Sequence, residues 1–111
     1  MEVHYTIKNN VALFHVTGQF GYGDEKRLID IGIKTIDSGA RIMALDTTKL
    51  DYVNSIGVAA LFSMVRFADD NNCEFVVFGM NRNVEMVLQK VFEKDYVPLL
   101  TEEEFTRKYL T

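Results

Sequence analysis

The sequence predicts an α/β fold, with one mixed β-sheet that begins in an N-terminal hairpin and carries about four helices. In residues 3–17, apolar and polar residues alternate on either side of an Asn-Asn pair, which is typical of an antiparallel hairpin. Beyond the hairpin, short apolar runs alternate with segments of helical spacing, a pattern that indicates parallel strands joined by right-handed helical crossovers. A chain of 111 residues has room for one hydrophobic core, so we expect residues 1–111 to form a single domain.

The hairpin strands are predicted over residues 3–8 and 11–17, because asparagine tolerates the positive φ of the tight turn between them. A two-residue turn sets the register and brings six apolar residues to one face, pairing Val3, Tyr5 and Ile7 with Val16, Phe14 and Ala12. The same register places His4 opposite His15. Two imidazoles could share a metal ion, but no third ligand lies near them in sequence, so we expect no metal there.

The first helix is predicted over residues 24–37, since apolar residues recur there at helical spacing and Ser38-Gly39 follows as a stop signal. The glycine-rich loop before it, residues 18–23, lacks the spacing of a phosphate-binding loop. A short apolar strand over residues 41–46 ends in the carboxylate of Asp46. We expect the polar residues after Asp46 to form a loop.

The second half of the chain predicts a helix over residues 55–71 and then a buried strand over residues 73–78. Residues 84–92 have the clearest amphipathic pattern of the chain, which predicts a helix packed on the sheet. A short edge strand is predicted over residues 96–99. The capping box at residues 101–104 predicts the start of a last helix.

Composition and charge exclude several classes of protein. The net charge is −4 and no lysine or arginine cluster occurs, so we expect no nucleic-acid partner. No apolar run approaches the ~20 residues that span a bilayer, so direct membrane insertion is not expected. The single cysteine, Cys73, cannot form an internal disulfide, which favours a reducing cytoplasm, and its place in a buried strand indicates a core residue.

Ligand sites in α/β folds usually lie beyond the carboxyl ends of the parallel strands. The polar residues expected at this rim are Asp46, Thr47, Thr48 and Asn81. Asp46 could bind a metal or act as a base, but we expect its carboxylate to cap the loop that follows. The hairpin histidines should lie far from the rim, which leaves Ser55 without a base. We therefore expect no catalytic residue, no cofactor and no metal, and an enzyme is the least favoured function.

The predicted helix over residues 55–71 is apolar on two faces. At 100° per residue, one face should meet the sheet, namely Val58, Leu61, Phe62, Val65 and Ala68. On the opposite side lies a second apolar stripe, made of Ile56, Ala60, Ser63 and Phe67, with Ala59 and Met64 beside them. If this stripe is exposed, it predicts docking of a protein partner, and Phe67→Glu should abolish binding without loss of stability. The alternative is that another element of the same chain covers the stripe.

Ser55 stands where the chain enters this helix. Its hydroxyl can cap the first turn of the helix. A phosphate on the same oxygen would be tolerated by the helix dipole while adding a charge of about −2 beside the apolar stripe. Ser55 is therefore either a cap or a phosphorylation switch.

Four features occur in order along residues 45–92. A strand ends in Leu45-Asp46, an Asn-Ser-x-Gly turn at residues 54–57 enters an apolar helix, the next strand ends in FVVFG, and Asn81-x-x-Val84 opens another helix. This arrangement resembles the STAS domain, named for sulfate transporters and anti-sigma factor antagonists. The resemblance extends over nearly the whole chain and implies the STAS-like mixed sheet.

The resemblance implies an anti-sigma factor antagonist-like regulatory module that binds a serine-kinase-type anti-sigma factor. In such antagonists the turn reads Asp-Ser-[Ser/Thr]-Gly and the partner phosphorylates the serine, which makes Ser55 the matching acceptor. Here Asn54 and Ile56 replace the aspartate and the second hydroxyl residue, and Gly21 stands where a loop aspartate is frequent.

The family also implies a partner-binding surface on the helix after the serine, and the matching residues are Asn54, Ile56, Ala60, Ser63, Met64 and Phe67. The alternative, favoured by Asn54, is a non-switching STAS subunit of a larger assembly such as a lipid-transport ATPase or a signalling scaffold. The oligomeric state stays open at this point.

Overall fold

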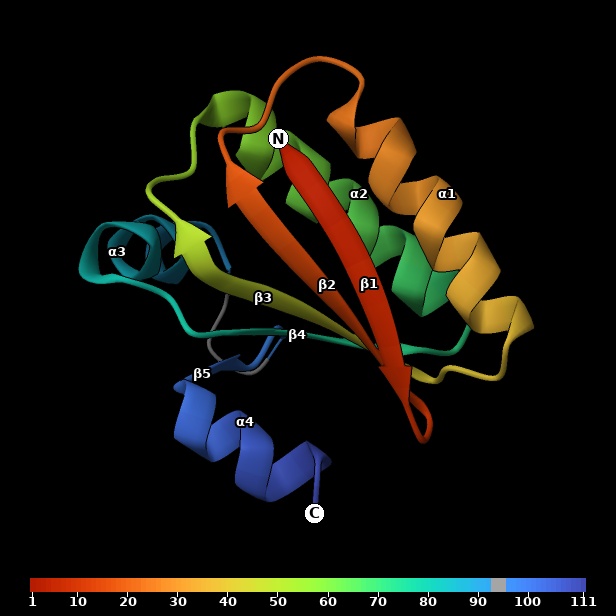
Figure 1. The fold of residues 1–111 in the computed structure, drawn as a ribbon. Coiled ribbons are helices and arrows are strands. Elements are labelled where there is room, and N and C mark those ends of the chain that lie inside the picture. Colours follow the sequence, from red (N-terminus) through yellow and green to blue (C-terminus); the bar gives the residue numbers. More distant parts are fainter. Residues whose placement is uncertain (93–95) are drawn as a thin grey trace.

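The computed structural model describes residues 1–92 and 96–111 of the chain. Its elements are β1 (Glu2–Lys8), β2 (Val11–Gly18), α1 (Asp24–Asp37), β3 (Ile42–Leu50), α2 (Ser55–Asp70), β4 (Glu74–Phe78), α3 (Arg82–Val91), β5 (Leu99–Leu100) and α4 (Glu102–Tyr109) (Figure 1). This order confirms the predicted α/β fold, and α1 has the predicted bounds. Among the described residues, no helix is long and apolar enough to cross a membrane.

The described strands form one mixed sheet in the order β1-β2-β3-β4-β5. β1 is antiparallel to β2, and each of the other neighbouring pairs is parallel. The hairpin register is the predicted one, with Val3, Tyr5 and Ile7 opposite Val16, Phe14 and Ala12. Asn9 adopts the expected positive φ, at 58°. The sheet therefore has a seven-residue strand at one edge and a two-residue strand at the other.

Helices cover both faces of the sheet (Figure 1). On one face, α1, α2 and α3 pack on the sheet and enclose the main core, which includes Phe14, Leu28, Leu45, Leu61 and Leu88. On the other face, α4 covers a smaller cluster of alternate strand residues through the buried ring of Phe105. Successive strand residues contribute to opposite clusters because their side chains alternate between the two faces.

Most of the second apolar stripe of α2 is covered within the chain, so the expectation that the whole stripe is exposed is wrong, although Ala59 is exposed and Ile56 is partly exposed. Ala60 and Met64 are buried. The hydroxyl of Ser63 donates a hydrogen bond to the Glu25 carboxylate on α1. The ring of Phe67 lies so close to Gly32 of α1 that a Cβ at Gly32 would come within 2.7 Å of it.

Phe62 was expected against the sheet, yet its side chain is 47% exposed and its ring packs on Phe92 at a centroid distance of 4.9 Å. The periodicity identifies two apolar faces of the helix but does not say which element covers each one. Leu61, Val65 and Ala68 of the predicted sheet-facing set are buried as expected. Because Ala60 and Met64 are buried with them, the helix is rotated relative to the prediction, and its open face includes Ser55, Ala59 and Phe62.

Two strands differ from the prediction by more than one residue. β3 continues past Asp46 as a strand, although the residues there are polar, because they pair with the end of β2. Thr47, expected in a loop, is buried, and its hydroxyl donates a hydrogen bond to the carbonyl of Phe78 at 2.9 Å. The last strand comprises Leu99–Leu100 rather than residues 96–99.

Candidate functional site

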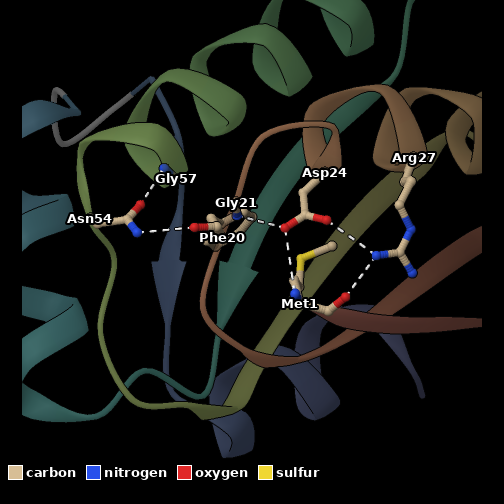
Figure 2. Close-up of polar contacts among 7 residues, drawn as sticks. All are labelled: Met1, Phe20, Gly21, Asp24, Arg27, Asn54 and Gly57. Carbon is tan, nitrogen blue, oxygen red and sulfur yellow. Dashed lines mark hydrogen bonds and ion pairs between the residues drawn. The ribbon is translucent and has the colours of Figure 1, made fainter.

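The N-terminus of α2 is tied to the loop between β2 and α1 by the side chain of Asn54 (Figure 2). Its Oδ1 accepts a hydrogen bond from the Gly57 N–H at 2.8 Å and so caps the helix. Its Nδ2 donates to the carbonyl oxygen of Phe20 at 3.0 Å. An ionised aspartate could not make both hydrogen bonds, because it has no donor. Asn54 therefore caps the helix and holds the loop.

The loop also packs tightly on the first turn of α2. The ring of Phe20 is buried against Gly57, where an added Cβ would lie 2.6 Å from the ring and 2.9 Å from Val53. Glycine at position 57 of the Asn-Ser-x-Gly turn is thus required for the loop to approach the helix closely.

Asp24 holds the other end of this loop (Figure 2). Its carboxylate is buried and accepts hydrogen bonds from the Gly21 N–H at 2.7 Å and from Arg27 at 3.1 Å. The ammonium group of Met1 lies 3.5 Å away. Burial alone raises the pKa of Asp24, but the Gly21 hydrogen bond and the two positive groups outweigh it and hold the pKa below its ordinary value. The sequence predicted Asp24 only as the start of a helix.

Asp24→Asn is expected to lower the free energy of unfolding by about 1.5–3 kcal/mol at pH 7, the range for hydrogen bonds to a charged group. Because folding depresses the pKa of Asp24, its contribution is complete above about pH 4 and is lost as the pH falls through the folded-state value. Urea unfolding at several pH values should therefore show the difference shrinking in acid. Asp30→Asn, in an exposed pair on the same helix, serves as the control and should cost less. A difference that is constant from pH 7 to pH 2.5 contradicts the assignment.

Ser55 is exposed as the first residue of α2 and lines a shallow hollow of about 350 Å³. The hollow lies between the β2–α1 loop and α2, and its lining residues are Gly21, Tyr22, Gly23, Glu25, Ser55, Ile56 and Ala59. The side chain of Tyr22 is 94% exposed. Glu25 is the one charged residue among these lining residues. The hollow thus combines an exposed hydroxyl with apolar groups at a helix N-terminus.

The structure brings together only some of the residues that the sequence predicted for partner binding. Asn54 and Ile56 are partly accessible beside Ser55. Ala60 and Met64 are buried in the main core, while Ser63 and Phe67 contact α1. Sequence reasoning missed Tyr22, for which the available signal was an aromatic side chain between two glycines in a loop.

Asp46 lies on the α4 side of the sheet and lines a different hollow from Ser55. Its Oδ1 accepts hydrogen bonds from the N–H and the hydroxyl of Thr48, which confirms the predicted capping role. Its Oδ2 lies 2.8 Å from Nδ1 of His15, whose ring stacks on His4 at 4.7 Å. Burial raises the pKa of Asp46, but the contacts with Thr48 and His15 outweigh it and lower the pKa overall.

The expectation that the hairpin histidines lie far from the rim is wrong for His15, since β2 is the neighbour of β3 and His15 is opposite Asp46. Asn81, another of the predicted rim residues, behaves as a structural cap. Its side-chain oxygen accepts a hydrogen bond from the Val84 N–H and so caps α3, and its Nδ2 donates to the carbonyl oxygens of Leu50 and Asp51. Within the described residues, no group of three or more His, Cys, Asp or Glu side chains is arranged to hold a metal.

Cys73 lies in the core, where burial raises the pKa of its thiol. A raised pKa lowers the thiolate fraction, and the thiolate is the nucleophilic form. The structure therefore agrees with the prediction that Cys73 is a core residue.

The fold and the site define a class of protein: a small α/β domain with an exposed serine where the helix between two parallel strands begins. The model of the STAS domain matches residues 2–105, and the chain belongs to this family. No curated protein sequence gives a significant match.

Solved structures of anti-sigma factor antagonists are similar to this one. A putative anti-sigma factor antagonist from Thermotoga maritima matches with a TM-score of 0.79 and 14% identity, over 98% of this chain and 95% of that chain. The anti-sigma factor antagonist SpoIIAA in its unphosphorylated form gives 0.74 and 14%, over 96% and 95%. The phosphorylated form of the Bacillus cell fate determinant SpoIIAA gives 0.70 and 12%, over 96% and 97%. At these identities the similarity shows a common fold.

Proposed function

We propose that this chain is a regulatory protein-binding module of the anti-sigma factor antagonist type, located in the cytoplasm, with a serine-kinase-type anti-sigma factor as its partner. The observation that carries the proposal is the exposed Ser55 at the rim of an apolar hollow, on a fold shared with anti-sigma factor antagonists. The chemistry of the hollow fits binding better than catalysis, because its described lining offers no imidazole, and its one carboxylate, Glu25, accepts a hydrogen bond from the hydroxyl of Ser63 rather than from Ser55.

The proposed docking surface consists of Tyr22, Ser55, Ile56, Ala59 and Phe62. It replaces the stripe proposed from sequence, because α1 covers most of that stripe. An exposed tyrosine and an exposed phenylalanine are suitable anchors for a protein interface, since aromatic side chains contribute much of the binding energy at such surfaces. The tie between Asn54 and Phe20 holds the loop and the helix of this surface together before any partner binds.

Phosphorylation of Ser55 would act on this surface directly. The helix dipole favours a phosphate there by up to ~1 kcal/mol, so the fold tolerates the added charge. Glu25 in the same hollow repels it, and none of the described lining residues is basic. At an apolar interface the phosphate must be desolvated, which opposes binding. The proposed switch therefore releases the partner when Ser55 is phosphorylated.

A second candidate function is a non-switching STAS subunit of a larger assembly, and Asn54 favours it. An aspartate before the serine could help to orient the hydroxyl or a metal-bound nucleotide during phosphate transfer. Here both ends of the Asn54 amide are already engaged in structural hydrogen bonds.

The test begins with capture of the partner from native lysate and its identification by mass spectrometry, followed by calorimetry with the purified partner. Ala59→Arg is expected to weaken binding at least tenfold and to leave stability within about 0.5 kcal/mol, because Ala59 is exposed in the middle of the surface. Met86→Arg, on the exposed side of α3, is the control and should bind normally. Normal binding by Ala59→Arg contradicts the proposed surface.

The same partner separates the two functions. After incubation with partner and ATP, intact mass and peptide mapping should locate one phosphate on Ser55, and Ser55→Asp should bind at least tenfold more weakly than wild type. Absence of phosphate together with equal affinity of Ser55→Asp assigns the protein to the non-switching class and leaves Ser55 as the first residue of the helix.

A further inference from the structure

β1 is an open sheet edge with the features that favour pairing with another strand. It pairs with β2 along all seven of its residues without a bulge, it contains no proline, and none of the described strands pairs with its outer side (Figure 1). Soluble proteins usually protect such an edge with a bulge, a proline or a covering element, or by making the edge strand very short, as β5 is here. Tyr5 and Ile7 on this strand are 40% and 38% exposed.

The free backbone groups of the edge belong to Val3, Tyr5 and Ile7. In a parallel ladder, the N–H and C=O of one residue point to the same neighbour, and the carbonyl of Asn10 accepts from Ile42 on the β3 side. The odd-numbered residues of β2 therefore point toward β1, and the register makes their partners the even-numbered residues of β1. The odd-numbered residues of β1 are left with their backbone groups directed outward.

We propose that two copies of this chain dimerise by antiparallel pairing of β1 with β1, about a two-fold axis at Tyr5. This register pairs Tyr5 with Tyr5 of the second copy and Val3 with Ile7, so all three outward-facing residues gain backbone partners. On the sheet face that carries α1, α2 and α3, it brings the exposed apolar side chains of Tyr5 and Ile7 of one copy next to those of the other. The two sheets then form one continuous sheet.

Charge selects the same register. The pairing about Tyr5 sets Glu2 of each copy opposite Lys8 of the other, and opposite charges directly across an antiparallel pair are favourable. Both side chains are exposed, and neither forms an ion pair with another described residue. In the same register, His4 of each copy lies opposite Thr6 of the other copy, on the sheet face that carries Glu2 and Lys8. A shift of the register by two residues loses the ion pairs and leaves one outward-facing residue of each strand unpaired.

The first test is sedimentation equilibrium of the purified chain from about 1 μM to 1 mM. We expect concentration-dependent formation of a species of twice 12.7 kDa. Glu2→Lys and Lys8→Glu should each weaken dimerisation about tenfold, since each change turns two attractive pairs into two repulsive ones, and the double variant should restore it. Glu103→Lys, an equal charge change on α4, is the control. A chain that stays monomeric at 1 mM, or a dimer that Glu2→Lys leaves unchanged, overturns the proposal.

The second test reads the two-fold axis directly by oxidative crosslinking. Tyr5→Cys places two thiols on residues whose Cα atoms are expected about 5.5 Å apart, within the range that a disulfide can bridge. Ile7→Cys places its thiols four residues out of register, roughly 14 Å apart along the strands. The buried Cys73 is common to both variants. Tyr5→Cys should form the covalent dimer at least tenfold faster, and equal rates overturn the proposed axis.

Discussion

Phe105→Ala is expected to lower the free energy of unfolding by about 3–5 kcal/mol, the range for truncation of a fully buried phenylalanine. Phe105 has no exposed surface, and its ring stacks on Phe78 at 4.0 Å and on Tyr109 at 5.3 Å. It is the one helical residue among the buried members of the cluster between α4 and the sheet. An eight-residue helix does not persist alone in water, so loss of this ring also releases α4.

Urea unfolding followed by circular dichroism measures this loss. Phe62→Ala removes the same atoms from a side chain that is 47% exposed, and this matched control should cost about 1 kcal/mol. A loss below about 1.5 kcal/mol for Phe105→Ala would show that α4 contributes little to the stability of the fold.

Phe67→Glu is expected to cost about 3 kcal/mol of stability, in contrast to the neutral effect that the sequence predicted. The ring is partly buried at the contact between α1 and α2, where it packs on Gly32. Glutamate removes the apolar contact and brings a carboxylate to an interface between helices, where its desolvation is unfavourable.

Phe62→Glu on the same helix makes the comparison decisive. The sequence placed Phe62 against the sheet and Phe67 in solvent, and the structure reverses this order. Thermal or urea unfolding should therefore show a loss of about 1 kcal/mol or less for Phe62→Glu. The opposite ranking of the two variants would support the sequence-based rotation of α2. Partner binding by Phe62→Glu is a separate measurement, and we expect it to be weakened because Phe62 lies on the proposed docking surface.

The long-range features of the site were harder to predict than its local ones. Ser55 at the helix entrance and the cap at Asn54 follow from residue types at successive positions. The hydrogen bond from Asn54 to Phe20 joins residues that are 34 positions apart, and the contact of His15 with Asp46 joins residues 31 apart. The second contact could have been predicted only with the strand order, because it depends on β2 lying beside β3.

The sequence by itself determined the features that depend on neighbouring residues. These are the hairpin register around residues 9–10, the bounds of α1, and the capping box of α4, which follow from turn geometry, periodicity and hydrogen bonds within a few residues. Only the tertiary structure decided which apolar face of α2 is covered and how far β3 extends past Asp46. The physical reason is that the hydrophobic effect has no direction: an apolar face must be buried, but α1 and a binding partner satisfy that requirement equally well.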